Sequence, residues 1–442
     1  MSELLQSKIA ELEQLGIQTE ICKKITGHIE ESIPQHLFRI SPYRLADDWS
    51  LDRDQVLNAF LYGTKNGIFD LEWDIKCPSC KGATSTTSTL KQLLSKSHCK
   101  YCQIDITGGF DDSVEVTFNV NPNIRKTEEL DFYSIMKSWH VFEEGITLSP
   151  EAGETQELRL TLSPGSYHLS NPEKGLSCPL LITESGEEKE RDIEYKYNGS
   201  SISRGNEWFG TGPVNITFKN DSEENLDFKF VKLKDQPWVS GAKVASNQIF
   251  RDYFSTELIS ADESFTVNNT VFIFTDIKGS TDLYERRGDS KAYYLVKEHF
   301  KIMTDKVRSN NGAIVKTIGD AIMATFTVSK DAINTVFEMH KAFDEFNLRE
   351  DTSDDIVIKI GAHRGPCIAV TSNDRLDYFG RTVNIAARVQ GLSGGGDIML
   401  SKELFSEPSI AEQIQEFGWN TKPIKATLKG IEGLYEVVHI TP

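Results

Sequence analysis

The stretch of residues 271–281 constrains the fold of this chain more than any other segment. A short apolar run ends at Asp276, and a Gly-Ser-Thr turn at 279–281 begins a helical pattern that reaches about Arg308. An apolar run with such boundaries predicts a buried strand. Asp276 would then lie at the strand end beside a helix N-terminus, whose free N–H groups favour phosphate. The segment therefore predicts a site for a metal-bound polyphosphate.

The length and charge of the chain limit its class. Its 442 residues exceed one ordinary domain, so two or three domains are expected. A net charge of −18 argues against general binding to nucleic acid or anionic membranes, because those partners require clustered cations. No segment approaches the ~18 continuous apolar residues of a membrane span, and residues 1–20 lack the apolar core of a signal peptide. We therefore expect a cytoplasmic protein without a membrane partner.

Four of the seven cysteines form two closely spaced pairs. They are Cys77, Cys80, Cys99 and Cys102. Two residues separate the members of each pair, and 18 residues (99 − 80 − 1) lie between the pairs, a spacing typical of a tetrahedral zinc site. Four thiolates leave no open position for catalysis, so we predict a structural Zn²⁺ in a zinc-ribbon-like segment at residues 76–125. His98 could replace one cysteine, although nothing requires it.

Residues 1–75 predict a helical region. Apolar residues recur at helical spacing, prolines at positions 34 and 42 interrupt them, and residues 68–73 alternate like a strand. Two helices followed by a β-wing suggest a winged-helix-like unit. Such a unit could bind DNA, but its second helix carries few cations, which favours a structural or protein-contact role.

Residues 126–240 are dense in short strand-like patterns. Apolar or alternating runs lie between turn residues, for example at 158–162 and 214–218. This density predicts a sandwich-like β-rich region, which could be a sensor or a spacer. Residues 241–268 are interpreted as a connector to a catalytic domain at residues 269–442.

The C-terminal part carries the pattern of a hairpin with an acid at its tip. Apolar strands are expected at residues 312–318 and 321–326, with only Gly319 and Asp320 between them. This spacing predicts a tight turn in which Asp320 is exposed enough to bind a metal.

The remaining elements of this part complete a βαββαβ order. Further strands are expected at residues 356–360 and 367–370, and helices are expected to begin near residues 329 and 382. The order predicts an antiparallel sheet with its helices on one face, a ferredoxin-like α+β fold.

Four short motifs lie in this part of the chain. They are Phe274–Thr281 (FTDIKGST), Val315–Asp320 (VKTIGD), Asp377–Asn384 (DYFGRTVN) and Asn384–Arg388 (NIAAR). Each is a weak signal alone, but in this order and at this spacing they resemble the catalytic domain of class III nucleotidyl cyclases. The N-terminal region resembles an uncharacterised domain found before some bacterial cyclases. Residues 44–49, the cysteine pairs and residues 114–118 carry this resemblance. That second resemblance brings no activity with it.

The cyclase resemblance implies conversion of ATP to 3′,5′-cyclic AMP and pyrophosphate with two Mg²⁺ or Mn²⁺ ions. Asp276 and Asp320 match the family's metal ligands, and the backbone carbonyl of Ile277 would add a further oxygen. One ion would lower the pKa of the ribose 3′-hydroxyl, and both would neutralise phosphate charge. The turn of Gly279, Ser280 and Thr281 is expected to hold the triphosphate.

Lys316 and Asp377 match the pair of residues that reads the base. Adenine offers an acceptor at N1 and a donor at its 6-amino group, which suits a Lys donor and an Asp acceptor. Guanylate cyclases tend to carry Glu and Cys at these positions, so the pair argues for ATP. A cyclase for another nucleotide, GTP or a pyrimidine triphosphate, is the alternative within this class.

Asn384 and Arg388 are four residues apart and share one helix face. The resemblance implies that Asn384 orients the ribose and that Arg388 stabilises charge on the phosphates in the transition state. Lys429 matches a phosphate-contacting lysine of the family, although an exposed loop lysine without a role fits the position nearly as well.

In this family the site lies between two catalytic domains, and each contributes different residues. This chain has one catalytic domain that carries the metal-binding, base-reading, ribose-orienting and transition-state residues together. Such a domain implies a head-to-tail homodimer with two equivalent sites. The N-terminal half is expected to be regulatory, with an unknown ligand or partner. Two hypotheses from other classes stay open: a DNA-binding regulator whose input is nucleotide binding, and a degenerate cyclase that only binds nucleotide.

Overall fold

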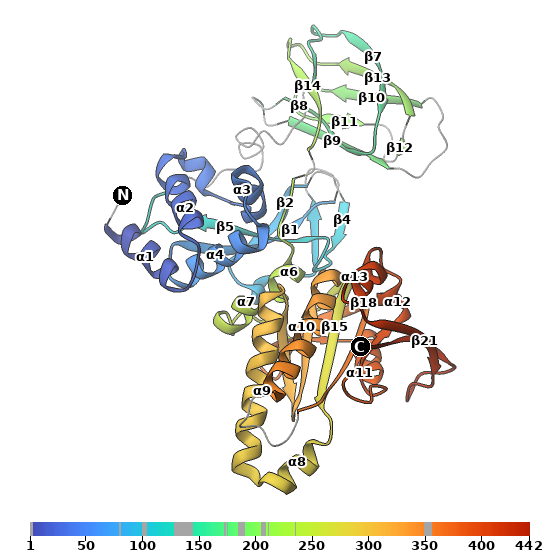
Figure 1. The fold of residues 1–442 in the computed structure, drawn as a ribbon. Helices are drawn as coiled ribbons and strands as arrows, with labels where there is room; N and C mark the ends of the chain where they lie inside the picture. Colours follow the sequence, from blue (N-terminus) through green and yellow to red (C-terminus); the bar gives the residue numbers. More distant parts are fainter. Residues whose placement is uncertain are drawn as a thin grey trace. The chain divides into compact units, whose positions relative to one another are not determined.

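The protein is described by a computed structural model, and Figure 1 labels many of its helices and strands. The described residues are 3–78, 81–99, 104–127, 145–171, 174, 176–183, 191–204, 209–210, 212–234, 236–348 and 356–442. The chain forms two compact units. The first unit contains residues 1–88, 96–108 and 115–238, and the second contains residues 89–95, 109–114 and 239–442. The units are therefore interleaved along the sequence.

Helices open the first unit. They are α1 (Glu3–Gln14), α2 (Thr19–Glu31), the short 3-10 helix η1 (Pro34–Leu37), α3 (Pro42–Trp49) and α4 (Arg53–Lys65). Helix α4 begins after Asp52, whose carboxylate accepts a hydrogen bond from the backbone N–H of Gln55 at 2.9 Å. Its buried face places Phe60 against Phe69, with ring centroids 4.3 Å apart, and against Phe118. These three rings join the helices to the strands that follow.

Strands of the first unit follow α4. They are β1 (Phe69–Lys76), β2 (Ala83–Thr87), β3 (Lys96–Cys99), β4 (Ile104–Thr107) and β5 (Val114–Val120). A sheet has the order β2-β1-β5, and β3 pairs with β4. The expected order of two helices and a strand is therefore present in residues 42–76, whereas the winged-helix-like interpretation stays a prediction.

Residues 146–232 form two sheets that share one core. The strands are β6 (Ile146–Leu148), β7 (Thr155–Leu162), β8 (Gly165–Asn171), β9 (Leu176–Thr183), β10 (Arg191–Tyr197), β11 (Ile202–Arg204), β12 (Phe209–Gly210), β13 (Gly212–Asn220) and β14 (Phe228–Lys232). One sheet has the order β11-β10-β13-β7 and the other β12-β9-β8-β14-β6. Buried side chains of both sheets, including Leu169 and Phe218, belong to one cluster. The arrangement is that of two packed β-sheets.

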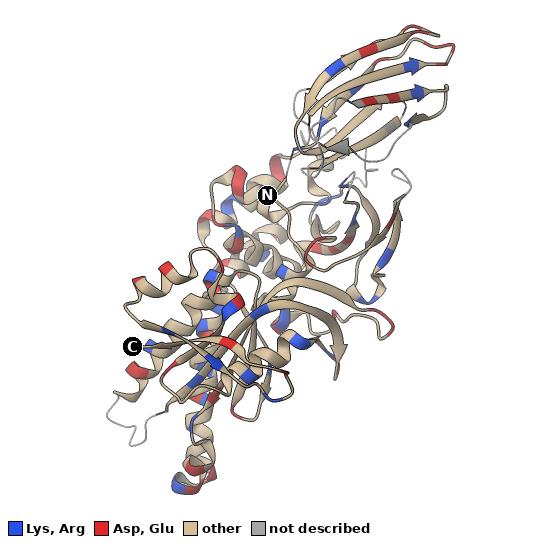
Figure 2. Cartoon of the chain, turned by 90° about the vertical axis from the view of Figure 1, so that its right-hand side faces the viewer, with Lys and Arg blue, Asp and Glu red and all other residues tan. Residues whose placement is uncertain are grey.

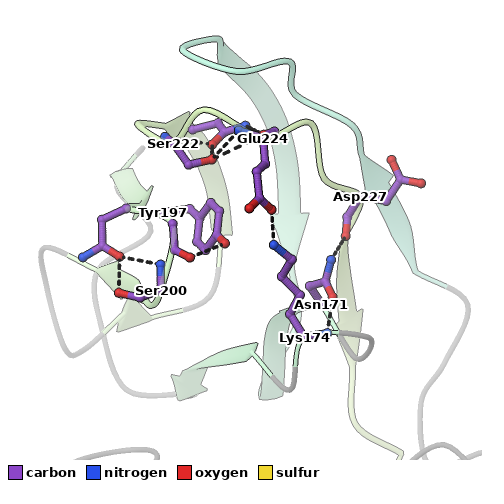
Figure 3. A network of polar contacts seen from close by, with 10 residues as sticks. Asn171, Lys174, Tyr197, Ser200, Ser222, Glu224 and Asp227 are labelled. Carbon is purple, nitrogen blue, oxygen red and sulfur yellow. Dashed lines mark hydrogen bonds and ion pairs between the residues drawn. The ribbon is translucent and has the colours of Figure 1, made fainter.

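Polar side chains join the loops at one end of these sheets (Figure 3). The side-chain amide of Asn171 donates to the carbonyl of Asp227 at 2.9 Å, and Lys174 pairs with Glu224. The Tyr197 hydroxyl donates to a loop carbonyl at 2.8 Å. These contacts connect residues of separate loops within this region.

The second unit is built around an eight-stranded mixed sheet. Its strands are β15 (Phe265–Ile277), β16 (Ala313–Ile318), β17 (Ala321–Phe326), β18 (Ile358–Ser372), β19 (Arg375–Phe379), β20 (Ile398–Ser401), β21 (Asn420–Ala426) and β22 (Tyr435–Thr441). Their order is β16-β17-β15-β18-β20-β22-β21, and β19 pairs with β18. The prediction of a purely antiparallel sheet is wrong, because β18 and β20 are parallel. A crossover through a helix connects these two strands, as parallel pairing requires.

Helices of the second unit cover both faces of this sheet. They are η2 (Leu90–Gln92), α6 (Gly241–Ala245), α7 (Gln248–Tyr253), α8 (Ser280–Arg287), α9 (Asp289–Ser309), α10 (Ser329–Asn347), α11 (Arg381–Gln390), α12 (Lys402–Phe405) and α13 (Ile410–Glu416). Leu400 shares a core with α9 and α10, whereas its neighbour Met399 packs with Ile385 of α11. Successive strand residues point to opposite faces, so α11 lies on the face opposite α9 and α10. The prediction that all helices lie on one face is therefore wrong.

Two segment predictions also need correction. Residues 358–360 of the first run and the whole run at 367–370 belong to one long strand, β18, which pairs along β15. The helix expected from 279 to 308 is divided into α8 and α9 at Gly288, whose φ is +74°. A glycine inside a helical pattern is tolerated but costly, and here the chain turns at it.

Two pieces of the N-terminal sequence belong to the second unit. The backbone N–H of Phe110 donates to the carbonyl of Thr266 at 2.7 Å, and its ring stacks on Phe265 with centroids 5.3 Å apart. The carboxylate of Glu257 accepts from the backbone N–H of Leu90 at 2.6 Å. The second unit therefore contains residues 89–95 and 109–114 as part of its packing.

None of the helices in the described part of the chain is long and apolar enough to cross a membrane. In the view of Figure 2, basic and acidic positions are interspersed along the ribbon of the described residues.

Candidate active site

Two carboxylates meet at one end of the sheet of the second unit. Asp276 lies near the end of β15, and Asp320 lies in the turn between β16 and β17. Antiparallel pairing of Thr275 with Ile322 brings these strand ends together. The backbone N–H of Ile277 donates to Oδ2 of Asp320 at 3.3 Å. The structure thus brings together two acids that are 44 residues apart (320 − 276) in the sequence.

The turn that carries Asp320 is as tight as the sequence predicts. Only Gly319 and Asp320 separate the strands, and Ile318 pairs with Ala321. Gly319 has a φ of +65°, a conformation that favours glycine. No atom would contact a β-carbon at Gly319 within 4 Å, so its backbone conformation, and not close packing, requires the glycine.

Burial and the nearby Asp320 raise the pKa of the Asp276 carboxyl above its usual range. Burial is the main cause, and the charge of Asp320 and a hydrogen bond to it add to the effect. A divalent cation between the two groups would offset this repulsion.

The donor set suits a hard metal ion. Both side chains offer oxygen, which Mg²⁺ and Mn²⁺ prefer. Within the described residues, no cluster of three or more His, Cys, Asp or Glu side chains could hold an ion alone. A Mg²⁺ ion normally binds through one or two carboxylates together with water and substrate phosphates. Asp276 and Asp320 fit that mode of binding.

The turn after β15 is exposed and begins α8. Gly279 precedes the first helical residue with a φ of +70°, and Ser280 and Thr281 start the helix. The carbonyl of Gly279 accepts from the backbone N–H of Leu283 at 3.1 Å. The first N–H groups of a helix have no partner within it, so this end can receive an anion. Lys429, by contrast, lies exposed on the loop between β21 and β22.

Lys316 and Asp377 are side by side, as the sequence predicts. Lys316 lies on β16 and Asp377 on β19, and Lys316 Nζ is 2.5 Å from Asp377 Oδ2. The Asp377 side chain is 9% exposed and that of Lys316 is 36% exposed. The backbone N–H of Tyr378 donates to the other oxygen, Oδ1, at 2.8 Å. The two side chains pair with each other in this structure. A base bound beside them would meet a hydrogen-bond donor in Lys316 and an acceptor in Asp377.

Asn384 and Arg388 lie on the exposed face of α11. The opposite face of this helix, including Ile385 and Val389, is buried. The helix can approach β18 because residue 361 is glycine, where a β-carbon would lie 2.1 Å from the backbone nitrogen of Gln390. Within the described residues, no hydrogen bond or ion pair joins Asn384 or Arg388 to the two acids.

Sequence reasoning missed His299 on α9. This side chain is fully buried, and its Nε2 lies 3.2 Å from the backbone oxygen of Asp320. Burial lowers the pKa of His299 to about 4, so the ring is neutral. One histidine in an apolar helical pattern has no distinctive spacing, which is why the sequence does not single it out.

Sequence reasoning also missed the contacts of α7. The side-chain oxygen of Gln248 accepts from the backbone N–H of Ile314 at 2.7 Å, and Arg251 donates to the carbonyl of Leu376 at 2.8 Å. A cavity of about 510 Å³ is lined by α7 together with Lys316 and its neighbours. The segment interpreted as a connector therefore contacts the strands that carry Lys316 and Asp377.

The zinc prediction concerns residues that the structure covers in part. Cys77 follows β1 and Cys99 ends β3, and both are buried. Cys80 and Cys102 lie outside the described residues. The structure does not support a zinc site, and the structural Zn²⁺ stays a prediction.

Comparisons with known proteins agree with the site. A family model described as the adenylate and guanylate cyclase catalytic domain matches residues 263–422, and one described as a family of unknown function (DUF5939) matches residues 1–163. An adenylate cyclase of Mycosarcoma maydis is 30% identical over 160 residues, which cover 32% of this chain and 6% of that protein. Adenylate cyclase 2 of Rhizobium meliloti (strain 1021) is 30% identical over 152 residues, 32% of this chain and 42% of that protein.

The similarity therefore spans less than half the length of these two relatives. Among solved structures, the adenylyl cyclase CyaB from P. aeruginosa matches with a TM-score of 0.36 and 22% identity, over 41% of this chain and 96% of that one. The family match covers the two acids, the hairpin and the helix that the geometry singles out. Residues 263–422 of the chain are therefore similar to the catalytic domain of adenylate and guanylate cyclases, the class III nucleotidyl cyclases.

Proposed function

We propose that the chain is an adenylate cyclase that converts ATP to 3′,5′-cyclic AMP and pyrophosphate. The observation that carries the proposal is the contact between Lys316 and Asp377, 2.5 Å apart on separate strands, in the chain that also pairs Asp276 with Asp320. The first pair suits adenine, and the second suits a metal-bound triphosphate.

The reaction needs one bond to form and one to break. The ribose O3′ joins the α-phosphorus, the bond from that phosphorus to the leaving pyrophosphate oxygen breaks, and the hydroxyl proton passes to solvent. Asp276 and Asp320, with the carbonyl of Ile277, would hold two Mg²⁺ or Mn²⁺ ions. When bound, these ions supply Lewis acidity, which lowers the pKa of the 3′-hydroxyl and neutralises phosphate charge.

The remaining residues bind and orient the substrate. Lys316 would donate to N1 of adenine, and Asp377 would accept from the 6-amino group. Asn384 would position the ribose, and Arg388 would donate to the phosphate oxygens as charge develops in the transition state. The N–H groups at Ser280 contribute to triphosphate binding, with Lys429 as a further candidate contact.

A second copy of the chain would complete each site. The face of α11 that carries Asn384 and Arg388 is exposed. Two apolar side chains beside candidate site residues are also exposed: Ile318, next to the hairpin tip, is 51% exposed, and Phe379, next to Asp377, is 51% exposed. A head-to-tail dimer would cover these side chains and bring the acids of one copy to α11 of the other. We propose two equivalent sites per homodimer.

The N-terminal half is proposed to be regulatory. Its residues 89–95 and 109–114 pack within the unit that carries the site, which supports a physical connection. A structural Zn²⁺ held by the four paired cysteines would stabilise the intervening hairpins.

The direct test is product analysis with the purified full-length chain. ATP, GTP, CTP and UTP are supplied separately with Mg²⁺ or Mn²⁺, and cyclic products are identified by mass spectrometry. We expect cyclic AMP with wild type, and none with Asp276→Ala. Asp305→Ala, which removes an exposed carboxylate from α9, serves as the matched control and should keep full activity. A different cyclic nucleotide as main product, or an active Asp276→Ala variant, would contradict the proposal.

A further inference from the structure

A buried histidine contacts the hairpin that carries Asp320. His299, on α9, is fully buried, and its Nε2 is 3.2 Å from the backbone oxygen of Asp320. A carbonyl oxygen can only accept a hydrogen bond, so the proton of the ring lies on Nε2. His299 therefore donates to the residue whose side chain is the proposed metal ligand.

The other nitrogen of this ring, Nδ1, makes no hydrogen bond within the described residues. This nitrogen is also buried. The ring lies among aromatic side chains, 5.4 Å from Phe300 and 5.3 Å from Phe343 between ring centroids. Leaving a buried acceptor unpaired is unfavourable, and an apolar side chain would fill the same space without that cost. Packing alone therefore does not explain a histidine here.

The contact has a geometric consequence for Asp320. Its carboxylate accepts from the backbone N–H of Ile277, and its carbonyl accepts from His299. These two bonds hold the residue from two sides, one to β15 and one to α9. The turn itself has only two residues, and Thr317 and Ile318 before it are exposed, so few other contacts fix its tip.

We propose that His299 is a positioning residue for the metal site. Its N–H fixes the hairpin tip, so that the carboxylate of Asp320 faces that of Asp276 at the separation a divalent cation requires. His299 touches neither the substrate nor the ion, and it acts through the backbone of Asp320. The inference rests on the proposed role of Asp276 and Asp320 as metal ligands. It predicts an effect on metal affinity that base recognition does not share.

The test compares two substitutions of similar length in the full-length protein. In His299→Gln the side-chain amide can donate to the same carbonyl, whereas His299→Met fills the space without a donor. Binding of Mn²⁺ is measured by electron paramagnetic resonance with an ATP analogue that lacks the 3′-hydroxyl, so no turnover is needed. Loss of groups that orient metal ligands weakens binding by about 10–100-fold. We expect about a tenfold weaker Mn²⁺ affinity for His299→Met and near wild-type affinity for His299→Gln.

Further readouts separate positioning from general stability. At saturating Mn²⁺, His299→Met should keep the KM for ATP, and its melting temperature should match that of His299→Gln. Equal Mn²⁺ affinity in wild type and both variants, or an equal loss in both variants, would overturn the inference. The variant Asp320→Asn distinguishes failure of the proposed metal site from failure of the role of His299. If Asp320→Asn binds Mn²⁺ with normal affinity, the proposed metal site is wrong. If Asp320→Asn loses Mn²⁺ binding while His299→Met binds it normally, only the proposed role of His299 is wrong.

A measurement on the wild-type protein covers the case in which His299→Met does not fold. Nitrogen-15 NMR of histidine-labelled protein reports which ring nitrogen carries the proton. Protonation of His299 at Nε2, with a resonance that shifts when Mg²⁺ and the analogue bind, supports the inference. Protonation at Nδ1, or a resonance that ignores the metal, overturns it.

Discussion

Base recognition can be tested at Asp377 by exchanging one atom. Its Oδ2 lies 2.5 Å from Lys316 Nζ, and its Oδ1 accepts from the backbone of Tyr378 at 2.8 Å. The substitution Asp377→Asn keeps the shape of the side chain, but it replaces an oxygen that only accepts by an amide that can donate. The variant should therefore lose preference for the 6-amino group of adenine and tolerate the O6 acceptor of guanine.

The structure sets the size of the expected change. A hydrogen bond to a charged group contributes about 1.5–3 kcal/mol, and at about 1.4 kcal/mol per factor of ten its loss corresponds to about 10–150-fold. Asp377 is nearly buried, so water replaces the lost contact poorly. We expect the ratio of kcat/KM for ATP to that for GTP to fall by about 10–100-fold, mostly through ATP.

The assay measures initial rates with both nucleotides at saturating Mn²⁺. Asp374→Asn is the matched control, because Asp374 is exposed in the turn before β19 with a φ of +55°, where asparagine is readily accepted. Its ratio should equal that of wild type. An unchanged ratio in Asp377→Asn would refute the role of this residue in base recognition, and an equal loss for both nucleotides would assign it a structural role.

Other features of the structure predict separate outcomes. Phe110 and Phe118 are both fully buried, so each Phe→Ala change should lower the free energy of unfolding by about 3–5 kcal/mol. Hydrogen exchange should increase in residues 239–442 for Phe110→Ala and in the first unit for Phe118→Ala. The same exchange pattern in both variants would contradict the assignment of Phe110 to the second unit. The raised pKa of Asp276 means that its charge destabilises the metal-free fold, so Asp276→Asn should raise the melting temperature at neutral pH. This increase in melting temperature should disappear as the pH falls below the ordinary pKa range of aspartate. An increase that does not depend on pH would refute the charge of Asp276 as its cause. Metal analysis should find one Zn²⁺ per chain in wild type and less in Cys99→Ser, with a lower melting temperature, and wild-type protein without zinc would end the zinc-ribbon prediction.

Part of the candidate site, the hairpin that carries Asp320, could be predicted from local signals in the sequence. Gly319 and Asp320 between two apolar runs predict a hairpin with an acid at its tip, because so short a connection permits little else. The contact between Lys316 and Asp377 spans 61 residues, and the sequence suggested it only through the resemblance of motifs.

Other parts depend on packing that no local pattern contains. The position of α11 on the opposite face follows from the direction of Met399, which differs from that of its neighbours on β20. The inclusion of residues 109–114 in the second unit depends on pairing with Thr266, more than 150 residues away in the sequence. His299 was missed because its role depends on one contact with a distant turn.

The central claim is that each site is shared between two copies of the chain, and a mixed dimer tests it directly. Asp276→Ala removes a proposed metal ligand, and Arg388→Ala removes the proposed phosphate contact on α11, so each variant alone should be inactive. Co-expression with different tags, followed by purification through both tags, yields dimers with one copy of each. In a head-to-tail dimer such a pair contains one site with both changes and one intact site, so it should have about half the wild-type activity. Mixed dimers no more active than either variant alone would contradict the account.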